Sequence, residues 1–93
     1  MTKELAEALA IQALTYLAGD GERLGRFLAV TGIGLGEIRS AAGEPGFLIG
    51  VLEYLASDEP VLSSFATEAG VAPTDIAMAH MALGGQPWER EVP

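Results

Sequence analysis

The stretch YLAGDGERLGRFLAVTGIG, residues 16–34, recurs in altered form as YLASDEPVLSSFATEAGVA, residues 54–72. The alignment extends without a gap from residues 8–43 onto residues 46–81, and 11 of its 36 positions are identical. Shared Tyr, Asp, Phe and Gly residues in one register are harder to obtain by chance than shared Ala or Leu. The sequence therefore predicts an internal repeat of two related halves.

Each half is predicted to form three helices. Apolar residues recur at helical spacing in the first segment of each half. Asp20 and Asp58 precede the second segment, where a carboxylate can accept the unpaired first-turn N–H groups of a helix. Gly32 and Gly70 follow it and suit the left-handed position that ends a helix. The expected helices span about residues 4–18, 21–31, 35–42, 46–56, 59–69 and 73–83.

These elements predict an all-α fold in which residues 1–93 form a single domain. We expect a compact bundle of about six helices, built from two related three-helix halves, with the first helix of each half at its centre. The halves cover about residues 4–43 and 46–83, and residues 84–93 form a C-terminal tail. Within the tail, Trp88 is either an apolar lid on its own chain or an anchor for a partner.

The charge of the chain limits its partners. Thirteen acidic and five basic residues give a net charge of −8, and residues 40–93 hold only Arg90 as a base. A field of this sign repels nucleic acid and anionic lipid, and favours either solubility or a basic partner. No uncharged apolar run reaches the length of a membrane span. Cysteine is absent and the start of the chain does not resemble a secretory leader, so we expect a cytoplasmic protein.

The glycines of TGIGLGEIRS, residues 31–40, raise the possibility of a phosphate-binding loop. Their G-x-G-x-G spacing follows a helical segment, and it matches neither the dinucleotide fingerprint nor the P-loop, which needs a following Lys. The second half carries Ala72-Pro73-Thr74-Asp75 in place of Gly34-Leu35-Gly36-Glu37. We therefore interpret this stretch as a helix stop at Gly32, a short turn and a helix start.

The second helix, the turn glycine and the third helix of each half have helix-turn-helix spacing. A nucleic-acid binder with this geometry would use Arg23, Arg26 and Arg39 as a small basic patch. The acidity of the chain argues against nucleic acid as a partner, and a helix corner that closes the bundle is the favoured interpretation.

The sequence offers little catalytic chemistry. His80 is the single histidine and lies among apolar residues, so a packing role is favoured over that of a general base in a small enzyme. No second His or any Cys is available for a zinc site. We expect no metal, no cofactor and no enzymatic activity.

The segments ERLGRFL, GEPGFLIGVLEYL and DEPVLSSF resemble a family of small, all-helical bacterial proteins that carry a domain of unknown function. The resemblance covers most of the chain and implies the helical fold, but no activity, cofactor or binding residue. We expect a protein that acts through protein–protein contacts, with another protein or as a homo-oligomer. The candidate interaction face consists of Met78, Met81, Trp88 and Arg39.

Overall fold

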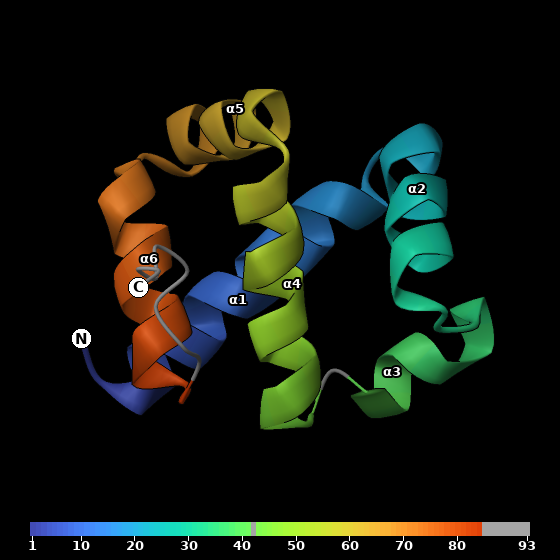
Figure 1. The fold of residues 1–93 in the computed structure, drawn as a ribbon, viewed down its shortest axis with the longest axis horizontal. Coiled ribbons are helices and arrows are strands. Elements are labelled where there is room, and N and C mark those ends of the chain that lie inside the picture. The colour runs from blue at the N-terminus through green and yellow to red at the C-terminus, as the bar shows by residue number, and fades with distance from the viewer. Residues whose placement is uncertain (42, 85–93) are drawn as a thin grey trace, which may run out of the picture.

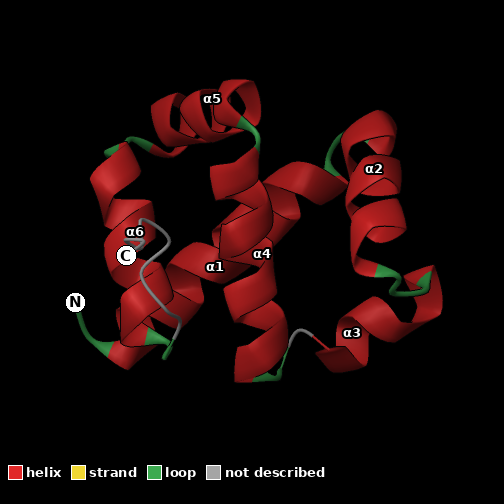
Figure 2. Ribbon diagram, in the orientation of Figure 1, coloured by secondary structure: helices red, strands yellow, loops and turns green. Residues whose placement is uncertain are grey.

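The computed structural model describes residues 1–41 and 43–84, and this part of the chain is helical without a strand (Figures 1 and 2). Helices α1 and α4 cross at the centre, α2 and α3 lie on one side, and α6 lies on the other (Figure 1). The all-α prediction with about six helices is confirmed. The elements are α1 (Lys3–Ala18), α2 (Gly21–Thr31), the 3₁₀ turn η1 (Leu35–Glu37), α3 (Ile38–Ala41), α4 (Pro45–Ser57), α5 (Glu59–Ala69) and α6 (Pro73–Ala82).

The ends of α2 and α5 follow the predicted chemistry. The Asp20 carboxylate accepts the backbone N–H groups of Glu22 and Arg23, and the Asp58 carboxylate accepts that of Val61. Such a cap contributes about 1 kcal/mol. Gly32 and Gly70 end the helices at φ of +75° and +73°, a region that glycine enters without steric cost. The predicted caps and stops are therefore confirmed.

The core lies where α1 and α4 pack together, as predicted for the first helix of each half. Three alanines of α1 are fully buried and let the helices approach closely. Helix α6 packs against both central helices through Ile76 and Ala79. The buried residues of the two central helices are Ala6, Leu9, Ala10, Ala13, Leu14, Leu17, Leu48, Val51, Leu52, Tyr54 and Leu55.

Two tyrosine–phenylalanine pairs connect the halves of the chain. The Tyr16 ring lies 5.5 Å from that of Phe65, and the Tyr54 ring lies 5.3 Å from that of Phe27. In each pair, the tyrosine of one half contacts the phenylalanine of the other. The Phe27 ring also lies 5.9 Å from that of Phe47. These pairs attach α5 to α1 and α2 to α4.

The repeat of two similar three-helix halves remains a prediction. Helices α2 and α5 have the same length and equivalent ends, but α3 has four residues and α6 has ten. The single helix expected at residues 35–42 was wrong, because residues 35–41 divide into η1 and α3. The glycines at positions 34 and 36 explain the difference, since glycine disfavours a helix whereas Pro73 suits the start of one.

Candidate functional site

Two of the predicted interface residues lie together on the outer face of α6. Met78 and Met81 are 49% and 56% exposed, although Ile76, Ala79 and His80 on the same helix are buried. Met1 and Ala82 complete the wall of a shallow hollow with the two methionines. We call these four residues, Met1, Met78, Met81 and Ala82, the methionine surface.

The other two predicted interface residues are not part of this surface as described. Arg39 belongs to α3, which lies across α4 from α6 (Figure 1). Trp88 lies outside the described residues, so the alternatives of lid and anchor both remain predictions.

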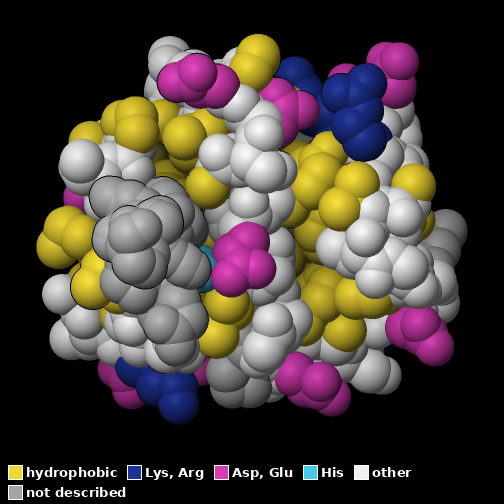
Figure 3. Space-filling model, in the orientation of Figure 1, with side chains coloured by type: hydrophobic (Ala, Val, Ile, Leu, Met, Phe, Trp, Pro, Cys, Tyr) yellow, Lys and Arg dark blue, Asp and Glu magenta, His cyan; other side chains and the backbone are white. Residues whose placement is uncertain are grey.

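Of the three arginines of the proposed basic patch, the structure brings Arg23 and Arg26 together at one hollow, beside Asp20 and Glu22, and leaves Arg39 apart. The Arg23 guanidinium lies 4.6 Å from the centre of the Tyr16 ring and 3.9 Å from the Asp20 carboxylate. The Arg26 guanidinium lies 3.8 Å from the Asp58 carboxylate. Arg39 lies on α3, beyond the opposite end of α2. Figure 3 shows basic side chains beside acidic ones at the upper edge of the molecule. This arrangement offers a polyanion no continuous basic surface and does not support nucleic-acid binding.

A phosphate site needs backbone N–H groups that are free to donate to the anion. In the glycine-rich turn, a carboxylate of the chain itself accepts from such a group. The Gly34 N–H donates to the Glu37 carboxylate at 3.1 Å, and the Ala72 N–H donates to the Asp75 carboxylate at 3.0 Å. Both turns therefore close a helix start with a negative side chain, which would repel a bound anion. The helix stop at Gly32 is confirmed, and the expected helix start after Gly34 is the 3₁₀ turn η1, which leads into α3.

His80 is a buried residue between α6 and α4. It is 1% exposed, and its Nε2 atom lies 2.9 Å from a carboxylate oxygen of Glu53, whose side chain is 56% exposed. A general base has to reach a substrate proton, and this ring is covered by its own chain. This burial agrees with the packing role expected for His80, which stays a prediction. Within residues 1–41 and 43–84, no three His, Asp or Glu side chains are grouped to hold a metal ion.

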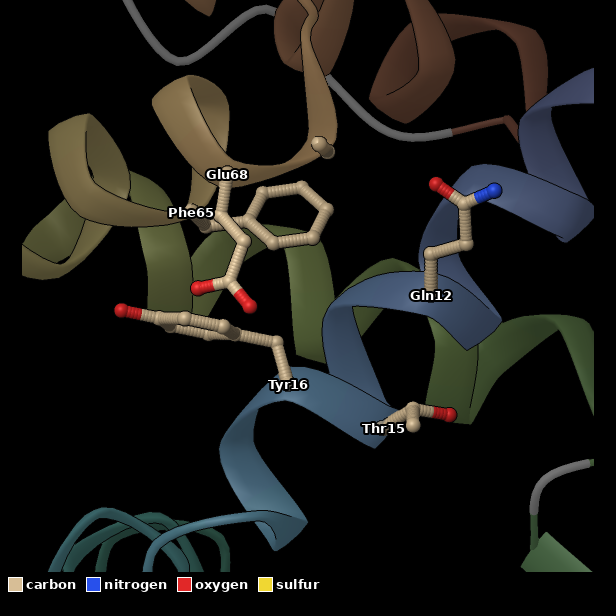
Figure 4. Close-up of a pocket in the computed structure, with 6 residues that line it drawn as sticks. Gln12, Thr15, Tyr16, Phe65 and Glu68 are labelled. Carbon is tan, nitrogen blue, oxygen red and sulfur yellow. The ribbon is translucent and has the colours of Figure 1, made fainter.

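The structure also contains a hollow between α1 and α5 that sequence reasoning missed. Figure 4 shows its apolar floor, formed by the rings of Tyr16 and Phe65, and the Glu68 carboxylate directed toward Tyr16. The Tyr16 hydroxyl donates to the Ser64 hydroxyl at 2.7 Å, which fixes the ring at the edge of the hollow. We call this site the α1/α5 hollow; its lining residues are Gln12, Thr15, Tyr16, Phe65, Glu68 and Ala69.

One signal in the sequence could have indicated the α1 side of this hollow. Gln12, Thr15 and Tyr16 are spaced to share one face of a helix, and residues 8–19 carry no charge. The α5 side could not be found in this way, because nothing in the sequence places Glu68 opposite a segment about fifty residues earlier.

The comparisons with known proteins identify a family but no activity. Residues 3–86 match the family described as proteins of unknown function, DUF3572, and the chain therefore belongs to this family. No curated protein and no solved structure matches the chain. In the described part of the chain, no helix combines the length and apolar character needed to cross a bilayer.

Proposed function

We propose that this DUF3572 protein is non-enzymatic and acts through protein–protein contacts made by the methionine surface. The observation that carries the proposal is the exposure of Met78 and Met81 on one face of α6, next to Met1. Methionine side chains are flexible and polarisable, so they adapt to the shape of a partner. Clustered exposed apolar side chains on a small acidic protein are typical of a contact surface.

The charge distribution on α6 supports the same proposal. Asp75 lies in the first turn, and from Ile76 to Ala82 the helix carries no charged side chain apart from the buried His80, if it is protonated. A partner can therefore cover the methionine surface without removing an ionised group of α6 from water, which would cost several kcal/mol. The burial of His80 against Glu53 supports the non-enzymatic part of the proposal. The absence of cysteine fits the reducing cytoplasm as the place of this contact.

The test compares two charge insertions at exposed apolar positions. Met81→Glu places a carboxylate in the methionine surface, and Val30→Glu places one on α2, where Val30 is 67% exposed. Sedimentation of the purified chain first shows whether a second copy is the partner. Affinity capture from a native lysate then follows with the wild type and both variants.

We expect Met81→Glu to abolish self-association or capture of the partner, and Val30→Glu to leave it intact. The proposal fails if the two variants behave alike, or if neither changes what the wild type binds. Circular dichroism of each variant shows that a loss of binding is not a loss of folding.

A further inference from the structure

The α1/α5 hollow is a second candidate site, separate from the methionine surface. We propose that it binds a basic side chain, arginine or lysine, from a protein partner. The occupant follows from the lining: an apolar floor of Tyr16 and Phe65, and a carboxylate, Glu68, at the rim. An arginine or lysine side chain combines an aliphatic stem with a cationic head, which matches a hollow of this kind.

The chain already uses one of these rings to hold a guanidinium. Arg23 lies with its Cζ atom 4.6 Å from the centre of the Tyr16 ring. The aromatic ring attracts cations through its electron-rich face, and the neighbouring carboxylate adds a stronger attraction. Tyr16 also lines the hollow, so its ring can contact a cationic side chain of a partner there.

The position of Glu68 favours a binding role over a structural one. Glu68 lies in the last turn of α5, which ends at Ala69, and this end of a helix carries partial negative charge. A carboxylate is unfavourable there, and the last turn of α5 contains no basic residue. Within the described part of the chain, Glu68 takes part in none of the ion pairs, which involve Asp20, Asp58 and Glu53. A bound cation would relieve this unfavourable position.

The charge of the whole chain also selects this occupant. The net charge is −8, so a basic segment is attracted over a distance and an acidic one is repelled. The hollow would then supply the specific contact. The aliphatic part of an arginine or lysine side chain can pack on its apolar floor, whereas a simple inorganic cation cannot.

The probe for the test is the peptide acetyl-Leu-Arg-Leu-amide, titrated into the full-length protein and followed by amide chemical shifts. We expect saturable shifts centred on Gln12, Thr15, Glu68 and Ala69. The citrulline analogue keeps the shape of arginine and removes its charge, and we expect it to bind at least tenfold more weakly. Binding of the citrulline or norleucine analogue within twofold of the arginine peptide would overturn the proposal, as would an absence of saturation.

Two matched variants separate the hollow from the general acidity of the surface. Glu68→Gln and Glu59→Gln each remove one charge from α5, but Glu59 lies at the opposite end of the helix. We expect Glu68→Gln to weaken peptide binding at least fivefold and to raise the melting temperature, and Glu59→Gln to leave binding within twofold. An equal loss with both variants would overturn the proposal, because it would indicate non-specific attraction.

A second pair of variants tests the hollow from the α1 side. Thr15→Arg supplies a guanidinium from the chain itself and should block the peptide, whereas Val30→Arg adds the same charge at an exposed position of α2 and should not. Met81→Glu should leave peptide affinity unchanged, since it lies on the methionine surface. The peptide assay and the capture assay can therefore succeed or fail independently.

Discussion

Replacing Phe27 with leucine tests how much the aromatic pairs between the two halves of the chain, Tyr54–Phe27 and Tyr16–Phe65, contribute to stability. Phe27 is fully buried and is the one buried residue of α2, and it contacts the rings of both Phe47 and Tyr54 at interplanar angles of 74° and 79°. A pair of this kind contributes about 0.5–1.5 kcal/mol beyond the area that it buries, so the two pairs contribute about 1–3 kcal/mol. Phe65, which is 2% exposed, pairs only with Tyr16 among the described residues, and its loss removes about 0.5–1.5 kcal/mol of this kind.

Both substitutions remove the same atoms from a buried position, so the cavity contribution largely cancels when they are compared. We expect Phe27→Leu to lower the free energy of unfolding by about 0.5–1.5 kcal/mol more than Phe65→Leu. For a domain of this size, this difference corresponds to about 4–8 °C in melting temperature for each kcal/mol. Urea unfolding followed by circular dichroism at 222 nm measures both values.

A double-mutant cycle between Phe27→Leu and Tyr54→Leu isolates one of the pairs. The expected coupling energy is about 0.5–1.5 kcal/mol. Equal losses for Phe27→Leu and Phe65→Leu, or a coupling energy close to zero, would refute the argument that the rings contribute through their edge-to-face contacts.

Two further predictions concern the helix ends and the helix interior, and urea unfolding checks both. Gly70→Ala should cost about 1–2 kcal/mol, because residue 70 has a left-handed backbone; an added Cβ would meet no atom within 4 Å, so the cost comes from the backbone alone. Gly25→Ala lies inside α2, where an added Cβ also meets no atom within 4 Å, and should stabilise the protein by about 0.5–1 kcal/mol. The opposite signs would contradict this argument from backbone conformation. Asp58→Asn keeps an N-cap and loses the partly exposed ion pair with Arg26, so it should cost less than about 1 kcal/mol. Asp58→Ala also loses the cap and should cost about 1 kcal/mol more; equal effects of the two substitutions would mean that the cap contributes little.

The sequence predicted the helices well where local chemistry decides their ends. Asp20 and Asp58, Gly32 and Gly70 act within one turn of the chain, so the ends of α2 and α5 could be read directly. The central position of α1 and α4 followed from their apolar spacing. The division of residues 35–41 into η1 and α3 was missed, because the repeat suggested a helix where glycines weaken one.

The arrangement of the helices in space was harder to predict. The α1/α5 hollow depends on Phe65 and Glu68 lying against Gln12, Thr15 and Tyr16, and no local pattern relates these segments. The separation of Arg39 from the methionine surface likewise depends on where α3 packs. Such contacts are set by the fit of whole helices, which a periodic pattern does not encode.

The contacts between α1 and α5 join residues far apart in the chain, and this separation limits how early the protein can fold during its synthesis. The hydrogen bond from Tyr16 to Ser64 joins residues 48 positions apart in the chain, and the neighbouring Tyr16–Phe65 contact spans one position more. At 5–20 residues per second, the ribosome needs about 2–10 s to extend the chain from one partner to the other. During that interval the apolar face of α1 lacks the helices that cover it in the folded protein, α4, α5 and α6. The nascent chain is therefore exposed to chaperones and proteases for seconds, and this domain can complete its folding only after α5 and α6 have been made.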